Sequence, residues 1–592
     1  MRRLASQTRL PHTIQHLSRS PLSIPSLKLP SIRKMTTNSQ SEESITSLEV
    51  RRSGILLHPT SLPGPYGIGD VGPASIKFLD WMHEAGQTLW QFLPLNPHGH
   101  AGTPYAVPSA MAASPAMIAL EPLLDVGLLK PEDVKELTQL NQEKVDYNNL
   151  TPLKRKALRL ARDRFRSGEV QHEQLGQWKE KMEEYVKSQG KEWLEDFALF
   201  MAISEDTKKC WVEWPAELRN RSADALDKAR QAYADAIDEH YFNQFLFAEQ
   251  WKATREKAAN LNIKLVGDIP IFVAYDSADV WANQKLFKLN AEGRQTVQAG
   301  VPPDYFSATG QLWGNPMYDW KACAEENYKW WALRFRRTLA LADIVRIDHF
   351  RGFQAAWEVP ITDKTAQGGK WVEGAGDKVF KSVNEQLKKK IPIIAEDLGL
   401  ITKEVTDLRE GLQFPGMRVL QFAWDSPNSE HLPHNVPYPG TVIYTGTHDN
   451  DTVRGFAEKA TPEQRRFLRD YLGRSTTPSV APGEKRKRGE GDADVSASSD
   501  REKDEAKEII ETASWDMIRL AISSTAYTSI VQLQDVLDLG SEARMNTPAT
   551  AEGNWAWRLK SQEALTSESA SKLKHLVNTY GRASASEQPE KK

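Results

Sequence analysis

Cysteine is scarce in this sequence: its 592 residues include only two, Cys210 and Cys323. Two cysteines are too few for a disulfide framework and fit a reducing compartment. A run of about 18 apolar residues is also missing, so the sequence predicts no membrane-spanning helix. Positive and negative charges nearly balance, at a net charge of −3. That balance gives no electrostatic reason to expect nucleic acid or an anionic membrane as a partner.

The N-terminal segment lacks acidic residues altogether until Glu42, and it is basic and rich in serine and proline. Such a leader is typical of an organellar transit peptide, which we place at residues 1–45 and leave out of the fold. A disordered tail without a targeting role is the alternative. Initiation at Met35 would instead produce a cytosolic form. At the other end, residues 583–592 are predicted to be a disordered tail.

The stretch Ala342–Gly352 carries charge where an ordinary buried strand would not. From Asp343 to Asp348, charged and branched apolar residues alternate with the period of two that is typical of a strand. Arg346 and Asp348 therefore project from one face, where the cation would keep the carboxylate ionised and oriented. An ion pair that only holds the strand in place explains these two residues equally well. Asp343 is expected to make a structural pairing at the opposite end.

Eight short apolar segments predict strands separated by helices or loops, near residues 55, 90, 265, 345, 393, 421, 443 and 530. This pattern predicts the α/β class and a (β/α)8 barrel over residues 50–582, with the active site at the carboxyl ends of the strands. Four acids are expected to meet there, because each closes a different predicted strand: Asp268, Asp348, Glu396 and Asp449. Scattered solubilising charges would not repeat that position.

Three long segments interrupt the barrel pattern. Residues from about 130 to 260 are charged and amphipathic, which predicts an inserted helical subdomain outside the catalytic framework. Residues 275–315 show little periodicity and predict a long loop, and such loops in compact domains are usually lids or binding loops. Residues from about 475 to 507 are rich in proline, glycine, serine and charge, which predicts a disordered surface insertion.

Several carboxylates at one barrel mouth suit two classes of chemistry. Metal-dependent barrels use acids and histidines as ligands, and His448–Asp451 offers such a cluster, but no ligand-spaced set of histidines accompanies it. Glycosidic-bond chemistry needs a carboxylate nucleophile and a carboxylic acid donor, about 5 Å apart when the anomeric configuration is retained. The arginine beside Asp348 and the 18 tryptophans, whose flat faces suit sugar rings as well as cores, favour glycoside chemistry without a metal.

A glycine-rich segment at residues 67–72 matches the G-x-G-x-x-G spacing of dinucleotide-binding sites. We reject that function, because the glycines do not directly follow a predicted strand and prolines interrupt their approach. The next predicted strand also ends near Asn96 rather than at the acid that would bind a ribose. No cofactor is therefore predicted.

Four segments together resemble the motifs of the 4-α-glucanotransferases, a family also called amylomaltases or disproportionating enzymes within the α-amylase clan. These segments are Gly267–Val273, Arg346–Gly352, Ala395–Gly399 and Gly446–Thr452. The resemblance extends from about residue 53 to 582 and is greatest to the plastidial branch of plants and algae. It implies a plastid location and no separate C-terminal β-domain.

The resemblance also implies a role for each matching residue. Asp348 would be the nucleophile, Glu396 the general acid/base and Asp449 the stabiliser of the transition state. The substrate-binding residues would be Tyr105, Asp268, Gln311, Trp313, Arg346, His448 and Asn546. The expected donor is an α-1,4-glucan and the expected acceptor is glucose or a malto-oligosaccharide, with no metal, cofactor, nucleic acid or membrane.

Two departures and two alternatives accompany this interpretation. The segment 106–115, after Tyr105, differs from the more polar stretch usual in the family, and most members lack the insertion at 475–507. A retaining α-glucan hydrolase of the same clan is the nearest alternative function. A catalytically silent glucan-binding protein is disfavoured because the three acids are intact. The oligomeric state stays open.

Overall fold

The computed structural model describes residues 51–303, 307–436, 440–474 and 495–583, and for residues 495–502 it describes the backbone only. The predicted leader at 1–45, nearly all of the predicted tail and residues 475–494 of the predicted insertion lie outside the described residues. Within the described part of the chain, no helix is both long and apolar enough to cross a bilayer.

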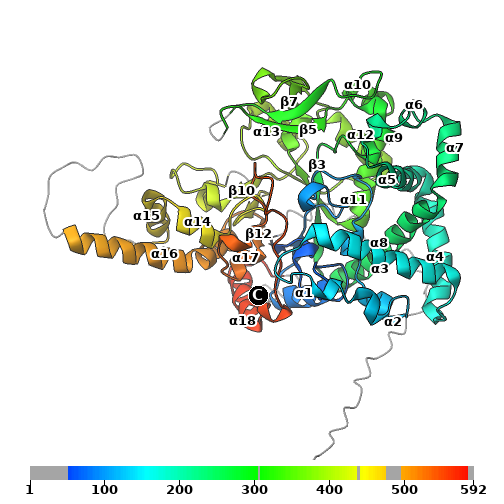
Figure 1. The fold of residues 1–592 in the computed structure, drawn as a ribbon. Helices are drawn as coiled ribbons and strands as arrows, with labels where there is room; N and C mark the ends of the chain where they lie inside the picture. Colours follow the sequence, from blue (N-terminus) through cyan, green and yellow to red (C-terminus); the bar gives the residue numbers. More distant parts are fainter. Residues whose placement is uncertain (1–50, 304–306, 437–439, 475–494, 584–592) are drawn as a thin grey trace, which may run out of the picture. The chain divides into compact units, whose positions relative to one another are not determined.

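Eight parallel strands form the central sheet (Figure 1), and the predicted (β/α)8 barrel is confirmed. Branched apolar residues fill these strands, which are buried on both faces as parallel strands require. In spatial order they are β10 (Met417–Val419), β11 (Val442–Tyr444), β12 (Thr528–Gln532), β1 (Arg52–Leu56), β2 (Leu89–Gln91), β3 (Lys264–Pro270), β6 (Ile344–Asp348) and β9 (Ile393–Ala395).

The seam between β9 and β10 closes the barrel with fewer backbone bonds than the other strand pairs. The Ala395 amide donates to the Pro415 carbonyl at 2.9 Å. Beyond it a side chain replaces the ladder, because Asp397 Oδ1 accepts from the Met417 amide at 2.7 Å. Arg409 and Arg418 approach the other oxygen of this buried carboxylate, at 3.2 and 3.5 Å. The seam therefore depends partly on one buried acid and its two cations.

Helices surround the barrel in Figure 1. The helices that follow or precede barrel strands are α1 (Pro73–Glu84), α8 (Ala234–Asn260), α11 (Lys329–Leu341), α12 (Lys378–Leu387), α13 (Lys403–Gly411), α14 (Val453–Lys459), α15 (Pro462–Tyr471), α16 (Val495–Ser523), α17 (Leu533–Val536) and α18 (Ser567–Thr579). Helix α1 has proline at its first position, where no amide is needed.

The segment from 130 to 260 is helical, but its last helix belongs to the barrel. Its helices are α3 (Tyr147–Ser167), α4 (Glu173–Gln189), α5 (Glu195–Thr207), α6 (Ala216–Arg219), α7 (Ala223–Ala232) and α8. On α8, the Trp251 ring lies 5.3 Å from Phe92 and 6.2 Å from Trp90, next to strand β2. The prediction that the whole segment lies outside the catalytic framework is wrong for α8, because its apolar side chains cover the barrel.

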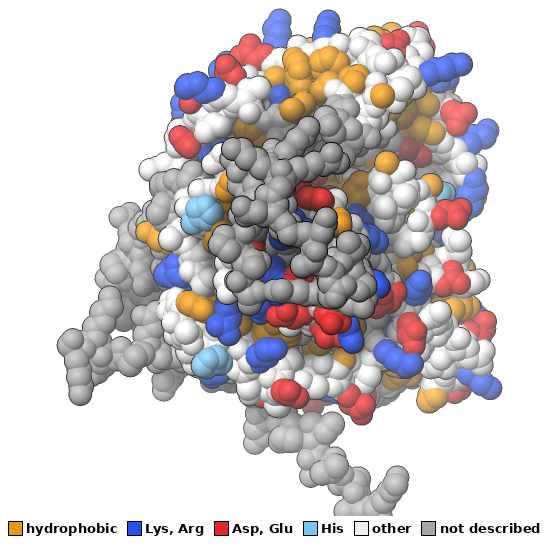
Figure 2. All heavy atoms as spheres, turned by 90° about the vertical axis from the view of Figure 1, so that its left-hand side faces the viewer, with side chains coloured by type: hydrophobic (Ala, Val, Ile, Leu, Met, Phe, Trp, Pro, Cys, Tyr) orange, Lys and Arg blue, Asp and Glu red, His pale blue; other side chains and the backbone are white. Residues whose placement is uncertain are grey.

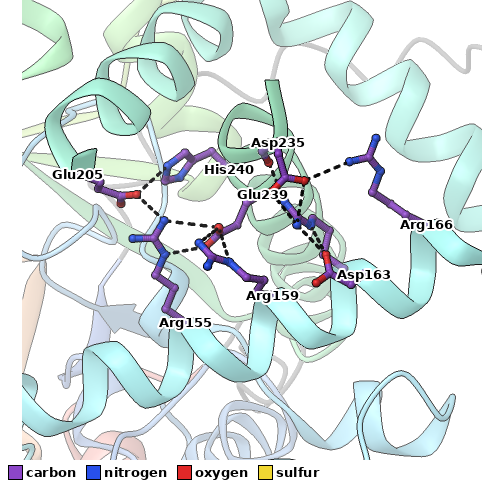
Figure 3. Close-up of polar contacts among 9 residues, drawn as sticks. Arg155, Arg159, Asp163, Arg166, Glu205, Asp235, Glu239 and His240 are labelled. Atoms are coloured by element: carbon purple, nitrogen blue, oxygen red, sulfur yellow. Dashed lines mark hydrogen bonds and ion pairs between the residues drawn. The ribbon is translucent and has the colours of Figure 1, made fainter. Parts of the chain in front are cut away.

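A network of charged side chains joins α3, α5 and α8 (Figure 3). Glu239 is 1% exposed and accepts from Arg155 Nε at 2.8 Å and from Arg159 Nη2 at 2.7 Å. Arg155 also pairs with Glu205 at 2.6 Å, and Glu205 lies 3.5 Å from His240 Nε2. Although burial acts to raise the pKa of Glu239, the hydrogen bonds from the two arginines lower it.

A second, antiparallel sheet occupies the region predicted as a long loop. Its strands in spatial order are β5 (Gln311–Pro316), β4 (Val297–Val301), β7 (Ala355–Pro360) and β8 (Lys370–Glu373). The same region also holds α9 (Ala278–Ala282), with α10 (Trp320–Glu325) beyond it. The loop prediction at 275–315 is therefore wrong in part, because β4 finds its partner β7 about 60 residues further along the chain.

Two smaller expectations have different outcomes. The disorder predicted up to residue 507 is wrong for residues 495–507, which form the start of α16. Charge on that stretch supports the helix, since Lys507 pairs with Glu511 one turn later at 3.9 Å. The structural pairing predicted for Asp343 is confirmed: it accepts from the Leu265 amide at 2.9 Å and from Arg255 at 3.0 Å.

The network on α3 and α8 predicts that Glu239→Gln destabilises the helical region by about 2 kcal/mol, because a buried carboxylate with charge-assisted hydrogen bonds is lost. The cost stays below that of a fully buried pair, since Arg155 and Arg159 are 34% and 49% exposed. Thermal unfolding of the two proteins at pH 7 measures the difference.

The matched control for that variant is Glu136→Gln. Glu136 pairs with Lys156 at the surface, with both side chains more than 60% exposed, and its loss should cost almost nothing. Because the pKa of Glu239 is lowered in the folded protein, its stabilisation is present above the unfolded pKa and is lost as pH falls through the folded value. The two proteins should therefore converge in stability in acid, and a difference that grows in acid would contradict the assignment.

Candidate active site

The four predicted acids lie at or just beyond the carboxyl ends of barrel strands. Asp348 is the last residue of β6, and Glu396 directly follows β9. Asp268 lies within β3, two residues before its end, and Asp449 lies in the loop after β11. Because parallel strands of a barrel end on the same side, this placement brings the acids to one mouth.

Arg346 lies between two of these carboxylates. It pairs across the sheet with Asp268 in the register of β3 and β6. Its Nη1 donates to Asp268 Oδ2 at 2.7 Å, and its Nη2 donates to Asp348 Oδ1 at 3.0 Å. Burial acts to lower the pKa of this 4% exposed guanidinium, but the two carboxylates raise it well above its usual value. The site therefore holds a permanent cation beside Asp348, as the sequence predicted.

Tyr105 and His448 extend this contact chain to Asp449. The Tyr105 hydroxyl donates to Asp268 Oδ2 at 2.7 Å, and its ring stacks on His448 with centroids 5.1 Å apart. His448 Nε2 lies 3.5 Å from Asp449 Oδ2, and Asn546 Nδ2 donates to Asp449 Oδ1 at 2.6 Å. The Asp449 side chain remains 45% exposed, so it is both held and accessible.

Glu396 is partly buried near Asp348 and is held by two backbone amides. The amide of His349 donates to Oε2 at 2.7 Å and that of Leu398 to Oε1 at 2.8 Å. Burial, followed by the negative charge of Asp348, raises the pKa of Glu396 from 4.5 to about 7, against the opposing effect of Arg346 and the amides. A carboxyl group with this pKa can both donate and accept a proton near neutrality.

His349 was not predicted as a site residue, yet it links Glu396 to Trp313. Its backbone is left-handed, with φ 55°, which costs about 1 kcal/mol for a residue other than glycine. That conformation directs its amide at Glu396, while its ring lies 4.8 Å from Trp313. Histidine tolerates this region better than most residues, but its position in the motif does not reveal the need for it.

Trp313 and Gln311 lie together on β5. Trp313 Nε1 donates to Gln311 Oε1 at 3.1 Å, and the indole is 37% exposed. The structure thus places all ten predicted residues in contacts that converge on the barrel mouth. Among the described residues, no group of three or more histidine, cysteine or acidic side chains lies close enough together to hold a metal ion.

Arg544 is a second residue that sequence reasoning missed. Its Nη2 donates to the Asp449 carbonyl at 2.6 Å and its Nε to the Asn546 carbonyl at 2.7 Å. It therefore fixes the two loops whose side chains meet at Asp449. The sequence offered no signal for it, because an isolated arginine has many ordinary roles.

The chain is similar in sequence to known proteins. Residues 57–565 match a family model described as 4-alpha-glucanotransferase. The chain is 43% identical over 541 residues to a 4-alpha-glucanotransferase from Solanum tuberosum described as chloroplastic/amyloplastic, covering 90% of this chain and 86% of that protein. It is 42% identical over 537 residues to the Thermus thermophilus 4-alpha-glucanotransferase, covering 90% and 99%.

A solved structure gives the same result in three dimensions. The Streptococcus agalactiae amylomaltase in complex with acarbose superimposes with a TM-score of 0.79 at 33% sequence identity. The match covers 90% of this chain and all of that one. The likeness therefore extends over most of this chain.

Proposed function

The chain belongs to the 4-alpha-glucanotransferase family, and we propose that Asp348, Glu396 and Asp449 carry out its reaction by a retaining double displacement. The protein is a transferase that moves segments of α-1,4-glucan from a donor to the 4-hydroxyl of glucose or another glucan. A hydrolase of the same clan is not favoured, because the relatives described above are named as transferases or amylomaltases. What we propose is the role of each of these residues and its contacts with the sugar.

The observation that carries this mechanism is the difference between two neighbouring carboxyl groups. Asp348 accepts from Arg346 at 3.0 Å, so a cation lies against the proposed nucleophile. Glu396, partly buried at the end of the neighbouring strand, has a pKa of about 7 and so carries a proton for much of the time at neutral pH. A carboxylate paired with a cation and a carboxyl group with a raised pKa, at the same mouth, are the two groups that a retaining mechanism needs.

In the first step, an Asp348 carboxylate oxygen attacks the anomeric carbon of the donor. Glu396 gives its proton to the departing 4-oxygen, and a glycosyl ester forms on Asp348 with inverted configuration. In the second step, Glu396 removes the proton from the 4-hydroxyl of an acceptor. That oxygen attacks the same carbon, releases Asp348 and restores the original configuration, so no net change in protonation remains.

Asp449 is assigned to the transition state. Asn546 and His448 hold its carboxylate by contacts of 2.6 and 3.5 Å, and Arg544 fixes its backbone. An anchored carboxylate that remains partly exposed can accept hydrogen bonds from ring hydroxyls of the sugar. These bonds strengthen as positive charge develops on the ring, which lowers the barrier.

The aromatic group at β5 is assigned to the acceptor. Trp313 is 37% exposed and lies against His349, whose amide contacts Glu396. A sugar stacked on this ring would exclude water from the side of Glu396 on which the incoming hydroxyl must be activated. Transfer then exceeds hydrolysis because the acceptor, rather than water, reaches the glycosyl ester.

The location of the protein is proposed from two supports. The leader at 1–45 is basic, rich in serine and free of acids except near its end. Three relatives, from Solanum tuberosum, Arabidopsis thaliana and Oryza sativa, are described as chloroplastic/amyloplastic. We therefore assign residues 1–45 to a transit peptide and the mature enzyme to a plastid, with a cytosolic form if translation starts at Met35.

Replacement of the nucleophile, Asp348→Asn, should lower glucan transfer from maltotriose by roughly 10³-fold or more, because no glycosyl ester can form. Chromatography of glucose and longer products measures the rate, and the thermal midpoint reports folding. Asp343→Asn is the matched control, since it removes an acid from the opposite end of the same strand. A folded Asp348→Asn protein with full activity would refute the assignment.

The pH dependence of transfer should follow Glu396. Its pKa is raised to about 7, so the protonated acid is present below this value and is lost as the pH rises through it. The kcat/KM for maltotriose should therefore fall tenfold per pH unit well above about pH 7. An alkaline limb that begins near pH 4.5, the ordinary value for glutamate, would show that Glu396 is not the acid.

Removal of the aromatic ring by Trp313→Ala should shift the products of maltotriose toward hydrolysis, because water then competes better for the glycosyl ester. The measured quantity is the ratio of glucans longer than maltotriose to maltose. Trp313→Phe keeps a flat ring and should retain most of the wild-type ratio. An unchanged ratio in Trp313→Ala would rule out the acceptor role.

A further inference from the structure

Large hydrophobic side chains that are exposed occur at only one side of the barrel in the described part of the chain. Four belong to the small antiparallel sheet or directly follow one of its strands, and two follow barrel strands β9 and β10. They are Leu312, Trp313, Ile361, Trp371, Leu400 and Phe422, with exposed fractions of 37% to 60%. Figure 2 shows hydrophobic side chains gathered on the molecule at the level of the small sheet.

Trp371, on edge strand β8, is the tryptophan of this set that the mechanism above does not use. It is 41% exposed, although tryptophan is usually among the most buried residues. The guanidinium of Arg351 lies 3.8 Å from its ring centroid, and Trp357 of strand β7 packs edge-on at 5.2 Å. These contacts hold the ring in one orientation while much of its surface stays open.

Arg351 connects this ring to the catalytic loops. It follows the nucleophile Asp348 by three residues and is itself only 7% exposed. Its Nη1 donates to the carbonyl of Leu400, which follows Glu396 by four residues and is 60% exposed. One buried cation therefore lies between the loop after β6, the loop after β9 and the Trp371 ring, so the ring borders the mouth on the side of those two strands.

From this arrangement we propose that Trp371 is a stacking platform for a glucose unit of a long α-1,4-glucan bound across the mouth. The inference rests on the proposed function and adds a distal contact to it. Trp371 lies on β8 and Trp313 on β5, the two edges of a four-stranded sheet, so three strand spacings, about 14 Å, separate their strands. We expect a chain of several glucose units to reach both rings, and maltotriose held at the catalytic acids to reach at most one.

The surroundings of Trp371 favour a sugar over a protein. Exposed Lys370 and Glu373 lie on the same short strand, whereas the centre of a protein interface is depleted of charge. A stable interface also buries about 800 Å² on each partner, far more than this ring and Leu400 provide. An aromatic face bordered by polar groups suits a ring that is apolar on its faces and hydroxylated at its edges.

The test compares long and short substrates in the full-length protein. Trp371→Leu keeps apolar bulk but removes the flat face, and should lower the ratio of kcat/KM on amylose to that on maltotriose by about tenfold, as expected for one lost stacking contact. Trp371→Phe should restore most of the ratio. Trp178→Ala, on remote helix α4, is the control and should leave the ratio unchanged. An unchanged ratio in Trp371→Leu would overturn the proposal.

A binding measurement separates this inference from the proposed function. Calorimetric titration of Asp348→Asn protein with maltoheptaose and with maltotriose needs no turnover. Adding Trp371→Leu should weaken binding of maltoheptaose several-fold more than binding of maltotriose, whether or not the wild-type protein transfers glucan. Equal effects on both sugars would refute the platform. A change of solution mass in Trp371→Leu with equal sugar binding would instead identify a contact between copies of this chain.

Discussion

The rest of the site depends on the buried cation at Arg346. A guanidinium removed from water is costly unless carboxylates surround it, and here two acids from neighbouring strands do so. Each acid also has a second function. Asp268 fixes Tyr105 by accepting its hydroxyl hydrogen bond, and Asp348 keeps one face open toward the mouth. The cation thus pairs with the nucleophile and fixes the positions of residues on three different segments of the chain.

Glu396, in the same site, has a raised pKa because the effects that disfavour its anionic form are the larger ones. Among the described residues no cation pairs with it directly. Burial and the charge of Asp348 raise its pKa by more than Arg346 and the two backbone amides lower it. The two carboxyl groups therefore differ in their partners, because Asp348 faces a guanidinium and Glu396 faces backbone amides. This difference explains how one site supplies both a nucleophile and an acid.

The sequence was sufficient for the features that have a local signature. Barrel strands appear as short runs of branched apolar residues, and the acids at their ends follow from the geometry of a parallel barrel. The small sheet was missed because its pairing joins distant segments, and β5 contains glycine, asparagine and proline, which seldom favour a strand. The left-handed backbone of His349 and the two carbonyl contacts of Arg544 depend on loops packing together, which periodicity does not report.

The seam between β9 and β10 has a consequence for how the enzyme loses activity. Glu396 directly follows Ala395, whose amide makes the backbone bond across that seam, and Asp397 supplies the next bond with its side chain. The catalytic acid is thus built at the least continuous junction of the sheet. A local opening there would hydrate Glu396 and return its pKa toward that of a free glutamate, and the enzyme would stop catalysing while most of the barrel remained folded.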